Sequence, residues 1–202
     1  MKTIITIQHT QSVHHTNGMV GSWTDWELTE LGREQAEKIG EKLAREIDGS
    51  EDVMYSSDLL RAKQTAEIVG RYLGLAPRLR TELREINAGC ACGKSVEWLR
   101  ENAKTEVQTI DDRLFPDAES RRDEWNRLVP FFDEIMNNAE EKIIIVSHGN
   151  MLSVFNSMFL GLEAESLNNG DMHGSAGGVS KMIVSDDGKR YIKRISDMSY
   201  IV

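Results

Sequence analysis

The sequence predicts an α/β protein, a three-layer α/β/α sandwich around a mixed, mostly parallel β-sheet. Two runs rich in β-branched residues, Thr3–Gln8 and Lys142–Ser147, are typical of strands that are buried on both faces. Strand-like and helix-like segments alternate along most of the chain, which favours parallel pairing. Two final strand-like segments joined by a short turn add antiparallel pairing, which makes the predicted sheet mixed.

Length and composition indicate a folded globular protein. The chain has 202 residues, of which 40% are hydrophobic and 28% charged, and we expect a single domain over residues 1–202. The formal net charge of −9 disfavours binding to nucleic acids and to anionic membranes. No apolar run is long enough to span a membrane and the N-terminus shows no signal-peptide pattern, so a cytoplasmic location is expected. The sequence is compatible with a homodimer.

The first strand is followed by a long polar segment and a helix. The segment Thr10–Glu27 has no helix or strand pattern, and an irregular stretch of that length in a compact domain is usually functional. Thr29 is a suitable N-cap for the helix that follows. We expect one face of this helix to contact the core through five apolar residues: Leu31, Ala36, Ile39, Leu43 and Ile47.

A second strand and helix come next. Asp52–Ser57 has the pattern of a short strand, and Asp58 is a candidate N-cap for the helix after it. Gly74 is expected to end that helix, because glycine adopts the left-handed conformation that often closes a helix. The apolar stripe of the helix consists of Ala62, Ala66, Val69 and Leu73.

The middle of the chain is less regular. Pro77–Leu83 predicts a short or edge strand, because proline is confined to such positions in a sheet. The loop Glu85–Gly93 then leads into a helical stretch near Ser95–Lys104. Glu119–Ala139 has apolar residues at helical spacing, and Pro130 inside it is expected to kink the helix or to start a new one.

The last third predicts a strand, a helix and a hairpin. Ile143–Ser147 is the strand and Met151–Leu160 is the helix. Val179–Ser185 and Arg190–Ser196 are separated by a short Asp-Asp-Gly turn, which is a typical hairpin signal.

Two histidines directly follow predicted parallel strands. His9 follows the first strand and His148 follows the late one. Ligands of such sheets bind beyond the carboxyl ends of the strands, so both rings should lie at one crevice. Arg61 falls in the first turn of a helix, where a cation is unfavourable unless an anion binds nearby. Gly149 begins another helix, whose free N–H groups can also bind an anion.

These segments, in this order, resemble the histidine phosphatase superfamily, also called phosphoglycerate mutase-like. Each motif alone is weak, but the ordered set covers nearly the whole chain. The principal matching stretches are Gln8-His9-Thr10, Ser57–Ala66, Leu83-Arg84-Glu85 and Ser147-His148-Gly149. Two further stretches also match, and they are Leu28–Ala36 and Pro116–Ser120, the latter with Arg127 downstream.

The resemblance implies a role for each matched residue. His9 would attack phosphorus and form a transient phosphohistidine, while Arg61 and His148 would hold the phosphoryl oxygens. Glu85 would protonate the leaving oxygen and then activate water. The substrate would be a small phosphorylated metabolite or phosphate, with no metal and no other cofactor. Expected substrate-binding residues are Gln8, Thr10, Ser12, His15 and Gly149.

The first motif departs from the family pattern. The family has arginine where this chain has Gln8 and glycine where it has Thr10. Losing one charged donor from a transition-state cradle reduces the rate by about 10²–10³-fold. We hypothesise that His14 and His15 compensate, since the family often has a phosphate-contacting asparagine in this region. The alternative is a catalytically weakened or inactive homologue that binds a phosphorylated ligand.

Other readings of the motifs are less favoured. Mutases of the family are longer and have tyrosine where Ala88 precedes Gly89, so a phosphatase is favoured over a phosphoglycerate mutase-type phosphotransferase. A metallohydrolase that uses the histidines His9, His14, His15 and His148 would match no standard ligand spacing.

Several other residues are interpreted as structural. Cys90 and Cys92 have no matching cysteine pair for a zinc site and are interpreted as ordinary thiols. Trp23 and Trp26 are expected to anchor the long polar loop to the body of the protein. His173 is interpreted as a loop histidine, with a place near the pocket as the alternative.

Overall fold

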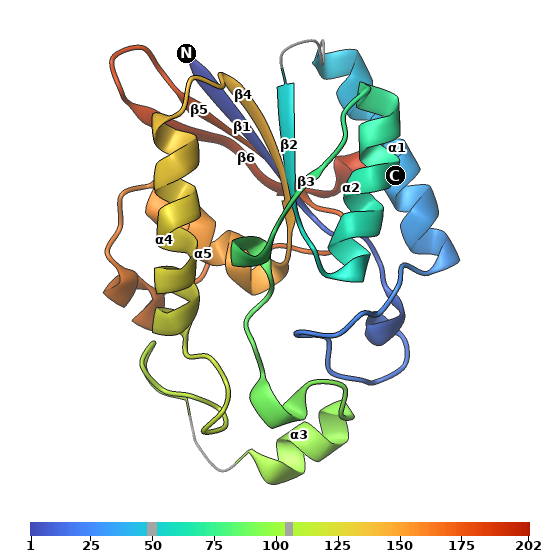
Figure 1. Cartoon of the computed structure of the whole chain (residues 1–202), viewed down its shortest axis with the longest axis vertical. Helices are drawn as coiled ribbons and strands as arrows, with labels where there is room; N and C mark the ends of the chain where they lie inside the picture. Colours follow the sequence, from blue (N-terminus) through green and yellow to red (C-terminus); the bar gives the residue numbers. More distant parts are fainter. Residues whose placement is uncertain (48–51, 104–106) are drawn as a thin grey trace.

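The computed structural model describes residues 1–47, 52–103 and 107–202, and a six-stranded sheet forms its centre (Figure 1). The strand order is β3-β2-β4-β1-β5-β6. The strands are β1 (Lys2–Gln8), β2 (Asp52–Ser57), β3 (Arg78–Arg80), β4 (Lys142–Ser147), β5 (Val179–Val184) and β6 (Arg190–Asp197).

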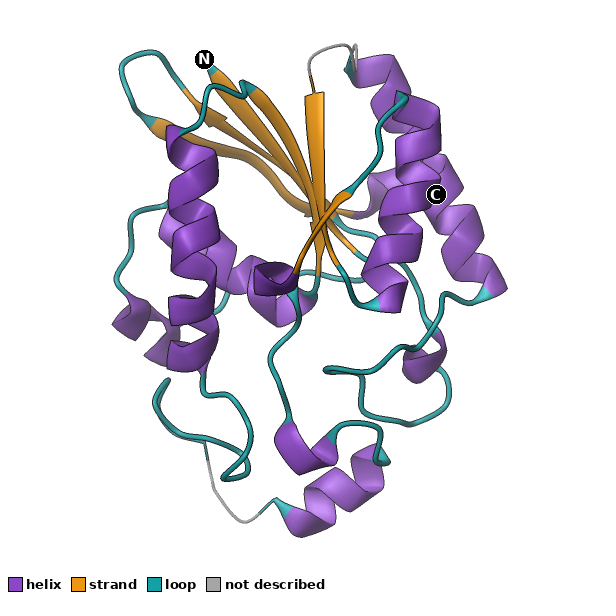
Figure 2. Ribbon diagram, viewed as in Figure 1, coloured by secondary structure: helices purple, strands orange, loops and turns teal. Residues whose placement is uncertain are grey.

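Helices cover both faces of the sheet, which confirms the predicted three-layer α/β/α sandwich (Figure 2). α1 and α2 lie on one face, and α4 and α5 lie on the other. The short α3 lies apart from the sandwich, at the end of the molecule toward which the parallel strands point. The helices are α1 (Glu30–Glu46), α2 (Leu60–Leu73), α3 (Val96–Asn102), α4 (Arg121–Asn137) and α5 (Gly149–Phe159).

The strand pairing is mixed and mostly parallel, as predicted. β4 pairs in parallel with both β1 and β2, and β2 pairs in parallel with β3. β5 and β6 form an antiparallel hairpin that joins the sheet beside β1. Gly188 in the hairpin turn has a φ of 80°, a conformation that glycine adopts without strain.

The core has two sides because successive residues of a strand point to opposite faces of the sheet. Ile4 of β1 packs on the α4–α5 side, whereas Ile5 and Ile7 pack on the α1–α2 side. This two-sided burial explains the continuous β-branched runs in the sequence. Other core residues on the α4–α5 side include Leu128, Phe131, Ile135, Val154 and Phe155. Those on the α1–α2 side include Ile39, Leu43, Ala62, Ala66 and Val69.

Several predicted helix ends are confirmed. The side chain of Thr29 caps α1 by accepting a hydrogen bond from the Gly32 N–H at 3.0 Å. Gly74 ends α2 in the left-handed conformation, with a φ of 69°. Ser95 and Ser120 cap α3 and α4 in the same way as Thr29 caps α1. Lys104, expected to end the helix near α3, lies outside the described residues.

Two expectations about helices are wrong. Leu31 is 47% exposed and does not face the core, because it lies in the first turn of α1 on the outer side. Asp58 does not cap α2, whose N-cap is Leu59, because its carboxylate forms an ion pair with Arg84. Of the two outcomes expected at Pro130, a new helix is excluded because α4 continues through the proline, and a kink stays a prediction. The proline is exposed, so water can bond the carbonyl left without an N–H partner.

Two irregular segments reach the carboxyl edge of the sheet. The predicted strand Pro77–Leu83 is shorter than expected, since β3 ends at Arg80 and a 3-10 turn covers Thr81–Leu83. This turn, and not a strand end, leads to Glu85. The long segment Thr10–Glu27 is a loop with one 3-10 turn, η1, over Val13–His15.

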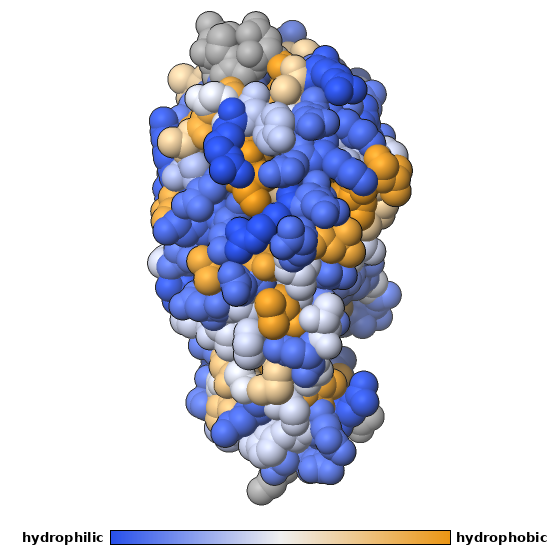
Figure 3. Space-filling model, turned by 90° about the vertical axis from the view of Figure 1, so that its right-hand side faces the viewer, coloured by the Kyte–Doolittle hydropathy of each residue, from blue (hydrophilic) through white to orange (hydrophobic). Residues whose placement is uncertain are grey.

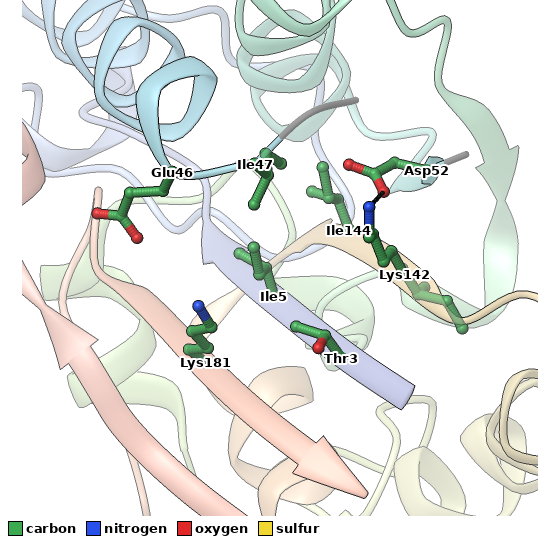
Figure 4. A pocket seen from close by; sticks show the side chains of 9 residues that line it. Thr3, Ile5, Glu46, Ile47, Asp52, Lys142, Ile144 and Lys181 are labelled. Atoms are coloured by element: carbon green, nitrogen blue, oxygen red, sulfur yellow. Dashed lines mark ion pairs between the residues drawn. The ribbon is translucent and has the colours of Figure 1, made fainter. Parts of the chain in front are cut away.

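A cavity of about 300 Å³ lies at the opposite edge, where the parallel strands begin (Figure 4). It lies beside Thr3 and Ile5 of β1, and an ion pair of 3.8 Å joins Lys142 to Asp52 at its side. Its described lining contains no histidine. The outer face of α1 and α2 is mostly hydrophilic, with separate small apolar spots (Figure 3). Among the described helices, none is long and apolar enough to cross a membrane.

We predict that Gly32→Ala destabilises the protein. A Cβ at this position would overlap the carbonyl oxygen of Gln11, and backbone cannot move away as a flexible side chain can. Chemical denaturation should show a loss of unfolding free energy of about 2 kcal/mol or more, typical of overpacking. Glu41→Ala on the exposed face of the same helix is the control and should change it by less than about 0.5 kcal/mol. Equal stability of the two variants would contradict this packing.

Candidate active site

The pairing of β1 with β4 brings two histidines together. Gln8 lies opposite Ser147 in the parallel register, so the next residue of each strand leaves the sheet at the same edge. The ring centroids of His9 and His148 are 5.1 Å apart, and both side chains are buried. The two rings therefore lie close together, as predicted, but of the two only His9 lines the cavity described below.

Hydrogen bonds define the state of the His9 ring. The Arg61 Nε–H donates to His9 Nε2 at 3.2 Å, so Nε2 holds a lone pair. The other ring nitrogen, Nδ1, lies 2.8 Å from the Thr10 carbonyl oxygen and donates to it. His9 is thus a neutral imidazole whose Nε2 is the nucleophilic atom.

Arg61 is a buried cation whose hydrogen bonds in the described part of the chain go to a ring nitrogen and to carbonyl oxygens rather than to a carboxylate. Its side chain is 1% exposed, and the two Nη groups donate to the carbonyl oxygens of Ser22 and Thr24 at 2.8 and 2.9 Å. Burial lowers its pKa to about 10, so the guanidinium stays charged at neutral pH. Ser22 has a φ of 46°, a strained conformation that its hydrogen bonds to Arg61, Ile86 and Ala88 maintain.

His148 lies at the start of α5, against the end of β2. Its Nε2 is 2.8 Å from the hydroxyl oxygen of Ser57, and its Nδ1 is buried without a hydrogen-bond partner in the described part of the chain. Burial and the nearby Arg61 charge lower the pKa of His148 well below its ordinary value. The same two causes act on His9, so both rings are neutral at neutral pH.

Glu85 reaches the same place from the loop after η2. Its carboxylate accepts hydrogen bonds from the N–H groups of Ile86 at 2.9 Å and Asn150 at 3.4 Å. The Glu85 carbonyl accepts the indole N–H of Trp23 at 2.6 Å and an N–H of Arg127 at 3.2 Å. The loop that presents this carboxyl is therefore held from two sides.

His14 and His15 lie beside His9 and are fixed by Ser12. The Ser12 hydroxyl is 2.7 Å from His14 Nδ1, and the Ser12 N–H donates to His15 Nδ1 at 3.1 Å. The His15 ring stacks on the His9 ring with centroids 5.4 Å apart. Since His15 Nδ1 accepts a hydrogen bond, neutral His15 has its proton on Nε2 and offers a donor there.

Gln8, Gly149 and His173 form the opposite wall. A Cβ at Gly149 would lie 2.6 Å from Cε1 of His173 and 3.3 Å from the amide nitrogen of Gln8. Only glycine allows these side chains to lie against the start of α5. His173, interpreted from the sequence as a loop histidine with the pocket as alternative, lines the pocket.

These residues surround a cavity of about 310 Å³. Of the expected site residues, those that line it are Gln8, His9, His15, Arg61, Glu85 and Gly149. Thr10 and Ser12 do not line it, which contradicts their expected place, because their hydroxyls bond elsewhere. Thr10 Oγ1 donates to the Gly32 carbonyl at 2.7 Å, and Ser12 Oγ bonds His14. His148 lies behind His9, outside the lining.

One group of side chains in the described residues has the spacing of a metal site. Ring nitrogens of His9, His14 and His15 all lie within 4.8 Å of one another. The hydrogen bonds do not favour a metal there, since His9 Nε2 faces the Arg61 guanidinium and His15 Nε2 holds a proton. Donor groups of this kind suit an anion instead.

The sequence did not assign roles to several supporting residues. Ser57 orients His148, the carbonyls of Ser22 and Thr24 hold Arg61, and Asn150 bonds Glu85. Ser57 begins one of the stretches that match the family, so the sequence did indicate that it lies near the site. Ser22 and Thr24 contact Arg61 through backbone carbonyl oxygens in a loop. Any residue type has such a carbonyl, so the sequence pattern does not predict these contacts.

Comparisons with known proteins show which sequences this chain is similar to. The model of the Histidine phosphatase superfamily (branch 1) matches residues 4–197. A 2,3-bisphosphoglycerate-dependent phosphoglycerate mutase from Bartonella tribocorum is 28% identical over 82% of this chain and 85% of its own length. A glucosyl-3-phosphoglycerate phosphatase from Mycolicibacterium vanbaalenii is 27% identical over 82% of this chain and 77% of its own length.

Solved structures share the fold. Bacillus stearothermophilus YhfR superimposes with a TM-score of 0.84 and 24% identity over 100% of both chains. A putative alpha-ribazole-5'-P phosphatase from Escherichia coli superimposes with a TM-score of 0.82 and 20% identity, over 98% of this chain and 97% of its own.

We predict that acid destabilises the protein through its neutral histidines. The pKa values of His9, His14 and His148 are lowered by burial, so the unfolded chain binds more protons once the pH falls below about 6.5. Above that pH these rings do not reduce the free energy of unfolding. Below it, each ring lowers the free energy of unfolding by about 1.4 kcal/mol per pH unit. Urea denaturation between pH 7.5 and 5 measures the slope.

His14→Asn should reduce this slope, because it removes one titrating ring whose folded pKa is about 3. Asn169→Ala, an exposed and uncharged position, should keep the slope of the unchanged protein. A slope that does not differ between the two variants would show that His14 does not contribute.

Proposed function

This chain belongs to the histidine phosphatase superfamily (branch 1), and from the chemistry of its cavity we propose that it is a metal-independent phosphomonoesterase. Its substrate would be a small phosphorylated metabolite, hydrolysed through a phosphohistidine intermediate. One observation carries the proposal: His9 Nε2 is an unprotonated nitrogen beside a buried guanidinium, with the Glu85 carboxyl in the same cavity.

In the first step, His9 Nε2 attacks phosphorus and the bond to the ester oxygen breaks. Arg61 must then turn its Nε–H from His9 to a phosphoryl oxygen, where the charge increases. Glu85 gives its proton to the leaving oxygen. The products of this step are the free alcohol, a phosphorylated His9 and a Glu85 carboxylate.

In the second step, water hydrolyses the phosphohistidine. The Glu85 carboxylate takes a proton from water as its oxygen attacks phosphorus, and the P–N bond to His9 breaks. Phosphate leaves, and His9 and protonated Glu85 are restored. His148 would stabilise the phosphoryl oxygens throughout, because its buried Nδ1 has no other partner in the described residues.

The relatives support this class of reaction. They include mutases and a phosphatase that act on phosphorylated compounds, according to their names. Structures of a mycobacterial glucosyl-3-phosphoglycerate phosphatase hold VO₃ in one case and inorganic phosphate in another. We favour hydrolysis over a phosphoglycerate mutase-type transfer because Ala88 stands where mutases have tyrosine.

A second candidate is a catalytically weakened or inactive homologue that binds a phosphorylated ligand. Gln8 favours it, because an amide in the cavity brings no charge and no bidentate fork where the family pattern has arginine. Ready hydrolysis of simple phosphate esters by the native chain would remove this candidate.

We predict that His9→Asn abolishes hydrolysis of p-nitrophenyl phosphate, with a loss of at least about 1000-fold in kcat, because the nucleophile is gone. With ³²P-labelled substrate, a rapid alkaline quench should leave label on the native protein and none on the variant. Glu41→Ala, remote from the cavity, is the control and should retain both activity and label. A His9→Asn protein as active as the native chain would end the phosphohistidine mechanism.

We predict that Glu85→Gln separates good leaving groups from poor ones. An alkyl phosphate needs a proton on its leaving oxygen, so its hydrolysis should fall by about 10²–10⁴-fold. Formation of the phosphoenzyme from p-nitrophenyl phosphate should fall far less, since p-nitrophenolate leaves without a proton. The measurement is the single-turnover rate with each ester. Equal losses for the two esters would contradict the general-acid role.

A further inference from the structure

Arg61 is the only arginine or lysine among the cavity-lining residues that the structure describes. Glu85 is the only acidic residue in the same lining, so the fixed charges of the wall sum to zero when that carboxyl is ionised. Gln8 contributes an amide, which has no charge. The cavity therefore offers many hydrogen-bond donors but little positive charge.

His9 and His15 add no charge to this sum while their present hydrogen bonds hold. A proton on His9 Nε2 would oppose the Arg61 Nε–H, and a proton on His15 Nδ1 would oppose the Ser12 N–H. His14 differs, because the Ser12 hydroxyl can either donate to its Nδ1 or accept from it. His14 can therefore accept a proton without losing a bond.

Three other arginines near the cavity are already paired with carboxylates. Arg84 forms a bidentate ion pair with Asp58, and Arg127 forms one with Glu119. Arg121, behind Asn150, contacts Glu124 and Asp171. The titratable and charged groups that line the cavity are His9, His14, His15, Arg61, Glu85 and His173. His148 lies behind His9, and the Asp25 carboxylate acts on Arg61 from outside the lining.

We infer that the cavity recognises a phosphoryl group with one negative charge, and that a doubly charged oxyanion enters it only together with a proton. This inference rests on the proposed function and adds the charge state of its substrate. A singly charged group balances Arg61 when Glu85 carries the proton that the proposed first step requires. A doubly charged group needs one more positive charge, which a proton on His14 supplies. Hydrolysis of phosphate monoesters would then be fastest at acidic pH.

Two oxyanions that do not titrate between pH 6 and 8 test the inference. Sulfate has two charges and methanesulfonate has one, and both are tetrahedral at sulfur. The chain has five histidines and all of them lie at this site, so their ring NMR signals report binding directly. The dissociation constant of sulfate should rise by about tenfold per pH unit, because one proton is bound with it. That of methanesulfonate should change by less than about twofold.

Two substitutions of Gln8 provide the matched comparison. Gln8→Arg adds a fixed charge to the wall, so sulfate binding should lose most of its pH dependence. Gln8→Met has a similar side-chain volume and adds no charge, so sulfate binding should depend on pH as it does in the native chain. Sulfate binding that is independent of pH in the native chain overturns the inference and leaves the proposed function standing. Binding of neither anion, nor of inorganic phosphate, overturns both.

Discussion

The pairing of β1 with β4 is the constraint on which the site depends. Both strands are buried on both faces, so their register is fixed by packing along their whole length. The residue that follows each strand then leaves the sheet at the same edge, and His9 and His148 lie 5.1 Å apart between ring centroids. A shift of one residue would turn every side chain of β1 to the other face. Packing of the core therefore sets the positions of the histidines at the base of the cavity, and the loops form the rest of its wall.

The burial of Arg61 explains much of the loop structure. A buried guanidinium requires partners for its N–H groups, and here they are the carbonyls of Ser22 and Thr24 and the ring of His9. None of these partners cancels the charge, in contrast to the carboxylates that pair with the neighbouring arginines. The hydrogen bond from Arg61 to the Ser22 carbonyl helps to hold the left-handed backbone conformation of Ser22. The loop conformation thus keeps one cation free for a ligand.

The sequence predicted those parts of the structure that follow from regular spacing. The strands, the helices and the meeting of His9, Arg61 and Glu85 all follow from periodicity, helix ends or ordered motifs. Thr10 and Ser12 do not line the cavity and Asp58 does not cap α2. Their side chains bond partners that lie far away in sequence or within a tight turn. A polar side chain with several reachable partners has no periodic signal that selects one of them.

A cation at position 8 could in principle act on the His9 nucleophile or on the oxygens of the phosphoryl group, and the protonation state of His9 distinguishes the two effects. Burial and Arg61 already lower the pKa of His9 well below its ordinary value, so the ring is neutral and nucleophilic without any help from position 8. A second cation there would add nothing to the availability of the lone pair. It would act on the oxygens of the phosphoryl group, whose charge grows during transfer. The amide of Gln8 therefore limits how well charge is stabilised, while the nucleophile itself is complete.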